Sequence, residues 1–445
     1  MLPLVLPLVL PLVLPLVLLQ ARERGTRVEL GVTQTVQRLK AGRTMVEQVL
    51  LNLARTGSQA RRRALAELTT RARSKSCICV RPSSWPSCCA GTRRHAPGRR
   101  CRCSSAAGPP GHPPRPQSSP MALGEFDLIQ KYFTRPTPQA VLGVGDDCAL
   151  LQPTAGMQWA ISSDMLVEGR HFLSTVRPER LGHKALAVNL SDLAACGAKP
   201  VAFMLALALP RVDEPFLAGL AQGLFSLADA HGIGLVGGDT TAGPLNICIT
   251  VFGEVPPGQA LRRDGARAGD ALWVSHPLHG GLGDARLALE AFRGHVSLGA
   301  DDLQAVRAAM EQPQPRVALG LGLRGLASAA IDLSDGLVGD LGHVLHRSGV
   351  GAVIRLDALP IGPVLARQPR QQQWQCALAG GDDYELLFTA PPAATVAVQA
   401  AAAAAGVGVR RIGTVTDAPG LHLLDGQGLP VALQLQGFDH FAAGA

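Results

Sequence analysis

The sequence predicts a mixed α/β protein, in which short strands alternate with alanine-rich helices. Three observations from Met121 onward support this fold class: short apolar runs recur, glycine-containing turns follow them, and alanine- and leucine-rich stretches lie between them. Apolar runs bounded by turn residues are typical of strands, and their alternation with helical stretches is typical of layered α/β architecture. With 445 residues, the chain is long enough for two or three domains.

The predicted elements follow in chain order. We expect strands at 159–163, 233–236, 245–255, 271–274, 329–333 and 385–389. We expect helices at 178–196, 214–230, 335–347 and 395–405. Gly197 follows the first helix directly, which is the usual position of glycine after a helix C-terminus. A Pro- and Gly-rich turn at 256–258 predicts a boundary between an N-terminal domain (121–257) and a C-terminal domain (258–445).

Charge divides the chain into two unlike segments. Residues 1–120 hold 20 Lys+Arg and 4 Asp+Glu, whereas residues 121–445 hold 22 and 30, although the whole chain has a net charge of +8. The latter part of the first segment is rich in Arg, Cys, Ser, Pro and Gly without periodicity, a composition that cannot bury a core. We therefore expect residues 1–120 to be a low-complexity, disordered extension, and Met121 to be the functional initiator.

Other roles for this extension are less well supported. A PLVL unit repeated four times at 3–18 is apolar enough for a membrane span, but one proline per helical turn opposes a helix, and no signal-peptide features accompany it. The arginine excess could contact nucleic-acid phosphates, yet no recognisable binding module accompanies it. The cysteine spacing within 77–103 matches no standard zinc pattern. We therefore expect no membrane and no nucleic-acid partner.

The four cysteines after Met121 are scattered in apolar contexts. They are Cys148, Cys196, Cys248 and Cys376. Scattered thiols of this kind are typical of reduced core residues in proteins of the cytoplasm, where disulfides are rare. We therefore expect a cytoplasmic protein.

Aspartates recur at the ends of apolar runs in the acidic segment. They are Asp146, Asp147, Asp164, Asp239, Asp332, Asp335, Asp382 and Asp383. Asp192 differs because it lies inside a predicted helix, three residues after Asn189 and so on the same face. A single Asp beside Gly commonly marks a turn, but a mid-helix aspartate is unfavourable. Several acidic segments without matching basic residues predict a site for a hard cation such as Mg²⁺.

Glycines beside these aspartates predict contacts with phosphate. Gly237 and Gly238 precede Asp239, and glycine lets the backbone approach a phosphate closely. Residues 334–336 open a predicted helix, whose N-terminal amides attract anions. The chain has no GxxxxGK[ST] sequence, which excludes a P-loop. GLGLRG at 320–325 matches the dinucleotide motif by letter only, since no strand precedes it and a helix is the better interpretation.

Eight short motifs occur in a specific order. They are GEFDLI (124–129), GVGDDCALL (143–151), SSDMLVEGRHF (162–172), NLSDLAACGA (189–198), GGDTT (237–241), IDLSDGL (331–337), GGDDYELLF (380–388) and GFDHF (437–441). Together they closely resemble the thiamine-monophosphate kinase family, part of the ATP-binding superfamily that includes aminoimidazole ribonucleotide synthetase. The resemblance covers residues 121–445 and none of residues 1–120.

The resemblance implies a fold, an assembly and a reaction. It implies two α/β domains per subunit, with the aminoimidazole-ribonucleotide-synthetase-like fold, and a homodimer in which the N-terminal sheets join. The implied reaction transfers the γ-phosphoryl group of ATP directly and in line to thiamine monophosphate, which gives thiamine diphosphate and ADP. Several Mg²⁺ ions would bridge the two polyanions. No protein nucleophile or general base is expected, because the acceptor is already a phosphate anion.

The resemblance also implies roles for individual residues. The implied magnesium ligands are Asp147, Ser162, Ser163, Asp164, Asp192, Asp239, Asp332 and Asp335. The implied ATP contacts are Gly238, Asp239, Arg263 and Ser334, and the implied substrate contacts are His171, Asp382 and Phe438. Asp382 stands where a glutamate is common in the family, which shortens its reach. The segment 276–289 departs from the expected spacing and is assigned no site.

Two further interpretations stay open. Another member of the superfamily, a selenophosphate synthetase or a hydrogenase-maturation protein, would need a reactive cysteine or selenocysteine near a terminus. Neither MALGEFDLIQ nor GFDHFAAGA contains a cysteine. A catalytically inactive, nucleotide-binding regulator is disfavoured because the acidic set is intact.

Overall fold

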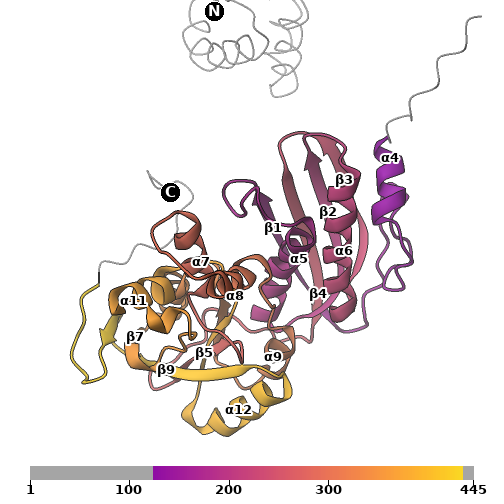
Figure 1. Cartoon of the computed structure of the whole chain (residues 1–445). Coiled ribbons are helices and arrows are strands. Elements are labelled where there is room, and N and C mark those ends of the chain that lie inside the picture. The colour runs from indigo at the N-terminus through magenta and orange to yellow at the C-terminus, as the bar shows by residue number, and fades with distance from the viewer. Residues whose placement is uncertain (1–123, 434–445) are drawn as a thin grey trace, which may run out of the picture. The chain divides into compact units, whose positions relative to one another are not determined.

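The computed structural model describes residues 124–433, which lie within one compact unit of the chain (Figure 1). The predictions for residues 1–120, for Met121 as initiator and for Phe438 with its GFDHF motif fall outside these residues. Two β-sheets with helices packed on them organise the described part. The predicted mixed α/β fold class is confirmed. No helix among the described residues is both long and apolar enough to cross a bilayer.

The first sheet has four strands in the order β1-β4-β2-β3. Its strands are β1 (Gln158–Val167), β2 (Lys199–Leu209), β3 (Gly234–Ala242) and β4 (Asn246–Val255). Helices α5 (Pro178–Ala195) and α6 (Glu214–His231) lie on one face (Figure 1). Phe203 and Leu205 of β2 are buried on that face, whereas Met204 between them faces the other way and is 38% exposed, as strand alternation requires. A short N-terminal segment precedes the sheet, with α4 (Glu125–Leu128) and η1 (Ile129–Phe133).

Strand β2 is absent from the predicted strands. Its sequence, KPVAFMLALAL, is a nearly continuous apolar run, and such a run does not distinguish a strand from a buried helix. The ladder between β2 and β4 shifts register between Pro200 and Ala202. This irregularity accommodates a proline, which cannot donate a ladder hydrogen bond.

The second sheet has six strands in the order β10-β7-β9-β5-β8-β6. These are β5 (Ala271–His276), β6 (Ala329–Asp332), β7 (Gly351–Arg355), β8 (Leu386–Ala390), β9 (Gly408–Thr416) and β10 (Gly420–Leu424). The helices are α7 (Asp284–Phe292), α8 (Ala300–Glu311), α9 (Val317–Gly322), α10 (Leu337–Ser348), α11 (Arg370–Ala379) and α12 (Thr395–Ala404), with 3-10 turns at Leu356–Ala358, Leu365–Arg367 and Pro392–Ala394.

Every strand and helix predicted from the sequence is present, with ends shifted by a few residues. The unpredicted elements are β2, β7, β9, β10, α4, η1, α7, α8, α9 as a complete helix, and α11. Gly320 lies in α9, which agrees with a helical rather than a dinucleotide-binding interpretation of GLGLRG. The first sheet ends at Val255 and the second begins at Ala271, so the turn at 256–258 lies between them.

Helix α5 contacts both sheets. One side packs on β1 and β4, and the other meets β6, α8 and α9. Polar residues on its second side reach across: Arg180 forms an ion pair with Glu311, and the His183 ring lies 2.8 Å from the Pro313 carbonyl. Arg180 and His183 are three positions apart, and residues with this spacing share a helix face. Both side chains can therefore reach the same neighbouring segment.

Glycines allow α5 and α6 to pack closely. A Cβ at Gly182 would lie 2.0 Å from the Leu220 carbonyl oxygen, and a Cβ at Gly223 would lie 1.7 Å from that of Glu179. Neither contact leaves room for a side chain, so the close approach of α5 to α6 depends on both glycines.

Candidate active site

Strand β1, helix α5 and the end of β6 bring four of the predicted metal ligands together. Asp164 lies on β1, Asp192 on α5, Asp332 at the end of β6 and Asp335 in the loop that follows. Their charges act on one another: Asp192 and Asp335 both influence Asp164, and Asp192 influences Asp332. We call these four residues the acidic cluster.

Hydrogen bonds join α5 to β1 within this cluster. The Ser162 hydroxyl on β1 donates to Asp192 Oδ2. Asn189 Oδ1 accepts from the backbone N–H of Asp164 at 3.1 Å. The prediction that Asn189 and Asp192 share a helix face is therefore confirmed, since both contact β1.

Burial and neighbouring carboxylates raise the pKa values of Asp164 and Asp332 in the acidic cluster. Burial, and then the charges of Asp192 and Asp335, raise the pKa of Asp164 to about 6. Burial and the Asp192 charge raise the pKa of Asp332 to about 7. A cation within the cluster would favour the ionised carboxylates, because an opposite charge lowers a carboxyl pKa.

The donor chemistry of the cluster suits a hard divalent cation, because its side-chain donors are all oxygens. Within residues 124–433, however, no three His, Cys, Asp or Glu side chains converge closely enough to hold an ion by themselves. Mg²⁺ commonly takes one or two protein carboxylates and completes its octahedral shell with water and substrate phosphates. The cluster therefore fits a metal that binds together with phosphate, rather than one held in an all-protein cage.

Two predicted metal ligands, Asp147 and Ser163, are not part of the acidic cluster. Asp147 is exposed, and its backbone N–H donates to Asp146 Oδ1 at 2.8 Å. The Ser163 hydroxyl lies on the opposite face of β1 from Ser162, 3.0 Å from Thr250 Oγ1. Successive residues of a strand face opposite sides, so only one of the two adjacent serines can present its hydroxyl to the cluster.

Gly238 and Asp239 lie on β3, at the opposite edge of the first sheet from β1. The residue row that contains Asp164 crosses β4 and β2 before it reaches Gly238. Three interstrand steps amount to roughly 14 Å. A Cβ at Gly238 would lie 1.7 Å from the Leu205 carbonyl oxygen, so the glycine is required by β2 packing. The metal and ATP roles of this pair stay predictions.

A cavity of about 380 Å³ opens on one side of the acidic cluster. Ser162, Asp192, Cys196, Arg263 and Arg347 are among its lining residues. Arg263, which was predicted to contact ATP, is exposed here, and its charge lowers the pKa of Asp192 against the larger effect of burial. An anion in this cavity would meet the guanidinium groups of Arg263 and Arg347, and Asp192 from the acidic cluster.

A second cavity of about 610 Å³ shares Asp192 with the first. It brings together the whole acidic cluster and three other predicted site residues, namely His171, Ser334 and Asp382. Apolar side chains complete its wall, among them Leu166, Phe172, Val188, Leu289, Phe292 and Met310. Cavities of this size and mixed lining typically bind a small organic molecule.

His171 lies in the turn after β1. Its Nδ1 accepts a hydrogen bond from the backbone N–H of Val167 at 3.0 Å, so the neutral ring carries its proton on Nε2. Gly169, with φ of 78°, allows the chain to turn between them. His171 therefore has a structural role in this turn, alongside the substrate role predicted for it.

Lys184 is a site residue that sequence reasoning missed. Its side chain is only 3% exposed, and Nζ donates to Asp382 Oδ2 and to the His171 carbonyl oxygen, each at 3.0 Å. A signal was present in the sequence: Lys184, Val188 and Asp192 are spaced by four, which places them on one helix face. A lysine within a buried apolar stretch is rare unless it is paired.

Two backbone amides directly before α10 are already hydrogen-bonded within the chain. The backbone N–H groups of Asp335 and Gly336 both donate to Asp340 Oδ2 at 3.1 Å. Asp340 is buried, and burial together with the Asp335 charge raises its pKa to about 7. The expectation that these amides bind a phosphate is therefore wrong for the two that Asp340 caps.

The segment 276–289 forms the end of β5, a glycine loop and the start of α7. The backbone N–H of Gly283 donates to Asp383 Oδ1 at 2.9 Å, which joins this loop to the loop that carries Asp382. Helix α7 then supplies Leu289 and Phe292 to the second cavity. The segment left without a role is thus one wall of the candidate site.

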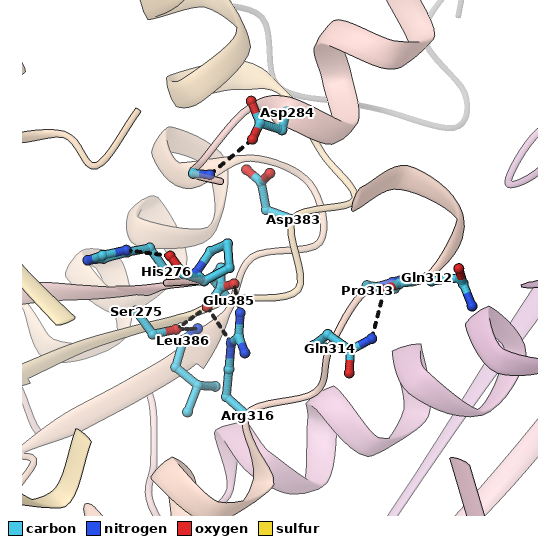
Figure 2. A network of polar contacts seen from close by, with 12 residues as sticks. Ser275, His276, Asp284, Gln312, Pro313, Gln314, Arg316, Asp383, Glu385 and Leu386 are labelled. Atoms are coloured by element: carbon cyan, nitrogen blue, oxygen red, sulfur yellow. Dashed lines mark hydrogen bonds and ion pairs between the residues drawn. The ribbon is translucent and has the colours of Figure 1, made fainter. Parts of the chain in front are cut away.

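Three acidic side chains lie in or next to these two loops, namely Asp284, Asp383 and Glu385. Figure 2 shows Asp284 and Asp383 near the Glu385–Arg316 ion pair, in which Arg316 donates to both Glu385 carboxylate oxygens. The Ser275 hydroxyl also donates to Glu385. Asp284 Oδ1 and Asp383 Oδ2 are buried without a hydrogen-bond partner among the described residues. Burial raises both pKa values, because a neutral carboxyl group costs less to bury than a carboxylate.

Comparisons with known proteins identify relatives of the whole described region. Family profiles described as AIR synthase related protein, N-terminal domain and C-terminal domain, match residues 145–255 and 267–426. The thiamine-monophosphate kinase of Escherichia coli (strain K12) is 44% identical over 329 residues, which cover 72% of this chain and 99% of that protein.

Solved structures agree with this similarity. The crystal structure of thiamine-monophosphate kinase from Stenotrophomonas maltophilia K279a has 45% sequence identity and a TM-score of 0.61, and covers 64% of this chain and 91% of its own. A structure described as AaThiL complexed with AMPPCP and TMP has 29% identity and a TM-score of 0.55, with 73% of this chain and all of its own covered. The two-domain fold implied by the sequence motifs is therefore confirmed.

Proposed function

The chain belongs to the thiamine-monophosphate kinase family, and from this premise we propose that it transfers the γ-phosphoryl group of ATP to thiamine monophosphate, giving thiamine diphosphate and ADP. The observation that carries the proposal is that two cavities share Asp192, and that the second is lined by the whole acidic cluster. Two phosphate-bearing molecules in these cavities would meet at the cluster.

The first cavity is the proposed site of ATP. Arg263 lines it, and a guanidinium pairs well with phosphate oxygens. The second cavity is the proposed site of thiamine monophosphate, with His171 and Asp382 in its polar wall and Phe292 in its apolar wall. A flat heteroaromatic substrate with a phosphate at one end matches a cavity that is apolar at one part and acidic at another.

The proposed metal ligands are Ser162 and the acidic cluster. Mg²⁺ bound there would neutralise charge between two polyanions and supply the electrostatic stabilisation that phosphoryl transfer requires. The chain's own contribution is to position both substrates for direct in-line transfer. No general base is needed, because the acceptor phosphate is already ionised at neutral pH. Roles for Asp147, Ser163 and Asp239 find no support in their positions within one chain.

A homodimer is part of the proposal. The face of the first sheet opposite α5 exposes large apolar side chains: Ile161 is 60% exposed and Met165 is 52% exposed. Apolar side chains on an open sheet face favour burial against another surface, and a second copy is the commonest partner.

A cytoplasmic location is also proposed. Within residues 124–433 the four cysteines are free thiols, as expected where disulfides are rare. The expectation that all four are core residues is wrong, because Cys148 and Cys196 are exposed.

The test is turnover by the full-length chain with ATP, Mg²⁺ and thiamine monophosphate. Thiamine diphosphate would be measured by thiochrome fluorescence after oxidation and chromatographic separation. Formation of thiamine diphosphate in step with ADP supports the proposal. A folded chain that forms neither product would overturn it.

A further inference from the structure

Lys184 is the cation that joins two loops of the second cavity. It extends from α5, and its ammonium group donates to the His171 carbonyl oxygen in the turn after β1 and to Asp382 in the loop before β8. Asp382 has φ of 68°, and Tyr384, two residues later, has φ of 48°. Positive φ is unfavourable for both residue types, so the Asp382 loop must be held by its surroundings.

The carboxylate of Asp382 is held from two sides. Lys184 Nζ lies 3.0 Å from Oδ2, and the Tyr384 hydroxyl donates to Oδ1 at 3.3 Å. The lysine side chain is 3% exposed, whereas that of Asp382 is 32% exposed. Both residues line the second cavity, and the carboxylate is the more exposed partner of the pair.

General attachment of α5 does not require this lysine. Arg180, one turn earlier, pairs with Glu311 at 2.8 Å, and Ser191, about two turns later, donates to Asp332 at 2.7 Å. What Lys184 adds is specific, because its two acceptors lie in two of the chain segments that carry predicted substrate contacts, those of His171 and Asp382. An ammonium group has three N–H donors, and these acceptors account for two of them.

We propose that Lys184 is a positioning residue for the thiamine monophosphate site, which fixes the His171 turn and the Asp382 carboxylate in one arrangement. This inference rests on the proposed function. It assigns the specificity for the acceptor substrate partly to a buried cation on α5 whose two hydrogen-bond acceptors, in His171 and Asp382, are not among the four predicted ATP contacts. Loss of the cation should then weaken use of thiamine monophosphate and leave use of ATP unchanged.

The test compares Lys184→Met, Asp382→Asn and the double variant in the full-length chain, with KM for each substrate and kcat measured separately. Lys184→Met keeps the length of the side chain but removes its charge and donors. We expect KM for thiamine monophosphate to rise at least about tenfold, the equivalent of about 1.4 kcal/mol, with KM for ATP within about twofold of wild type. A merely structural role would not separate the two substrates.

The double variant tests the link between the two residues. Lys184→Met leaves Asp382 without its cation, whereas the double variant removes both charges. If the residues act as a unit, the double variant should be no worse than the poorer single variant. Effects that multiply, or a KM for thiamine monophosphate unchanged in Lys184→Met, would overturn the inference.

Controls separate this inference from folding and from the proposed function. Lys131→Met is the matched control, since Lys131 is an exposed lysine paired with Glu214; its kinetic constants should equal those of wild type. If Lys184→Met does not fold by circular dichroism, Lys184→Gln, which retains N–H donors, replaces it with the same expected split. Absence of turnover in the wild-type chain would overturn the proposed function. An active wild-type chain with a Lys184→Met variant of equal KM for thiamine monophosphate would overturn only the role of Lys184.

Discussion

The Ser191 hydroxyl donates a hydrogen bond of 2.7 Å to Asp332 Oδ2, which joins helix α5 to the end of strand β6. The next residue, Asp192, accepts from Ser162 on strand β1. Successive helix residues point about 100° apart, so two neighbours on one helix reach two different sheets. The arrangement of the acidic cluster therefore depends on the position of α5 between the two sheets.

Asp332→Asn should abolish turnover without loss of stability. The amide oxygen can still accept from Ser191, and the neutral side chain avoids the cost of an ionised carboxylate whose pKa burial has raised to about 7. We expect kcat to fall at least about 100-fold, in line with the loss of a metal-site residue. Thiochrome-based rates and urea unfolding at pH 7.5 measure the two quantities, and Asp357→Asn is a control on an exposed 3-10 turn. Near-normal kcat would refute a ligand role.

Arg263→Met should weaken ATP use alone. Arg263 lines the first cavity and not the second, so KM for ATP should rise about tenfold, the effect of losing one charge-assisted hydrogen bond. KM for thiamine monophosphate should stay within about twofold. Arg355→Met, at an exposed ion pair with Asp357, is the matched control. An equal rise in both KM values would contradict the assignment of the two cavities.

The sequence was most informative where local chemistry decides the structure. Asp192 was recognisable as unusual because a mid-helix aspartate is unfavourable, and the structure places it between both cavities. Strand alternation also explains why Ser162 reaches the cluster and Ser163 does not. That distinction was available from the predicted strand, although the motif resemblance implied both residues.

The rest depends on tertiary arrangement. The order β1-β4-β2-β3 places Gly238 and Asp239 at the far edge of the sheet from Asp164, and strand order cannot be derived from apolar patterning. Lys184 was missed because its two partners, His171 and Asp382, lie in distant parts of the sequence. The hydrogen bonds of the Asp340 carboxylate were missed for a similar reason. They form only because the loop before α10 folds back onto the first turn of that helix.

Asp284→Asn should change the pH dependence of stability. Burial raises the pKa of Asp284 from its ordinary value of 3.8 to about 6 in the folded chain, so the folded state favours the protonated acid more than the unfolded state does. The stability from this preference is complete below about pH 4 and is lost as pH rises through about 6. Asparagine cannot ionise, so above pH 7 the unfolding free energy of the variant should exceed that of wild type by up to about 3 kcal/mol. Urea unfolding at pH 5 and pH 8 measures the difference. A difference in unfolding free energy between variant and wild type that is independent of pH would contradict the raised pKa of Asp284.

Gly182→Ala should destabilise the chain, because the added Cβ would lie 2.0 Å from the Leu220 carbonyl oxygen at the α5–α6 contact. Forcing two packed helices apart costs about 1–3 kcal/mol. Gly342→Ala is the matched control: Gly342 lies on the exposed side of α10, and its added Cβ would meet nothing within 4 Å. There the same substitution should stabilise by about 0.5–1 kcal/mol, since alanine is the better helix former. Opposite signs in urea unfolding would establish that close packing, and not helix propensity, sets the position of α5 and hence of the acidic cluster. Two stabilising substitutions would show that α5 can move away from α6 without cost.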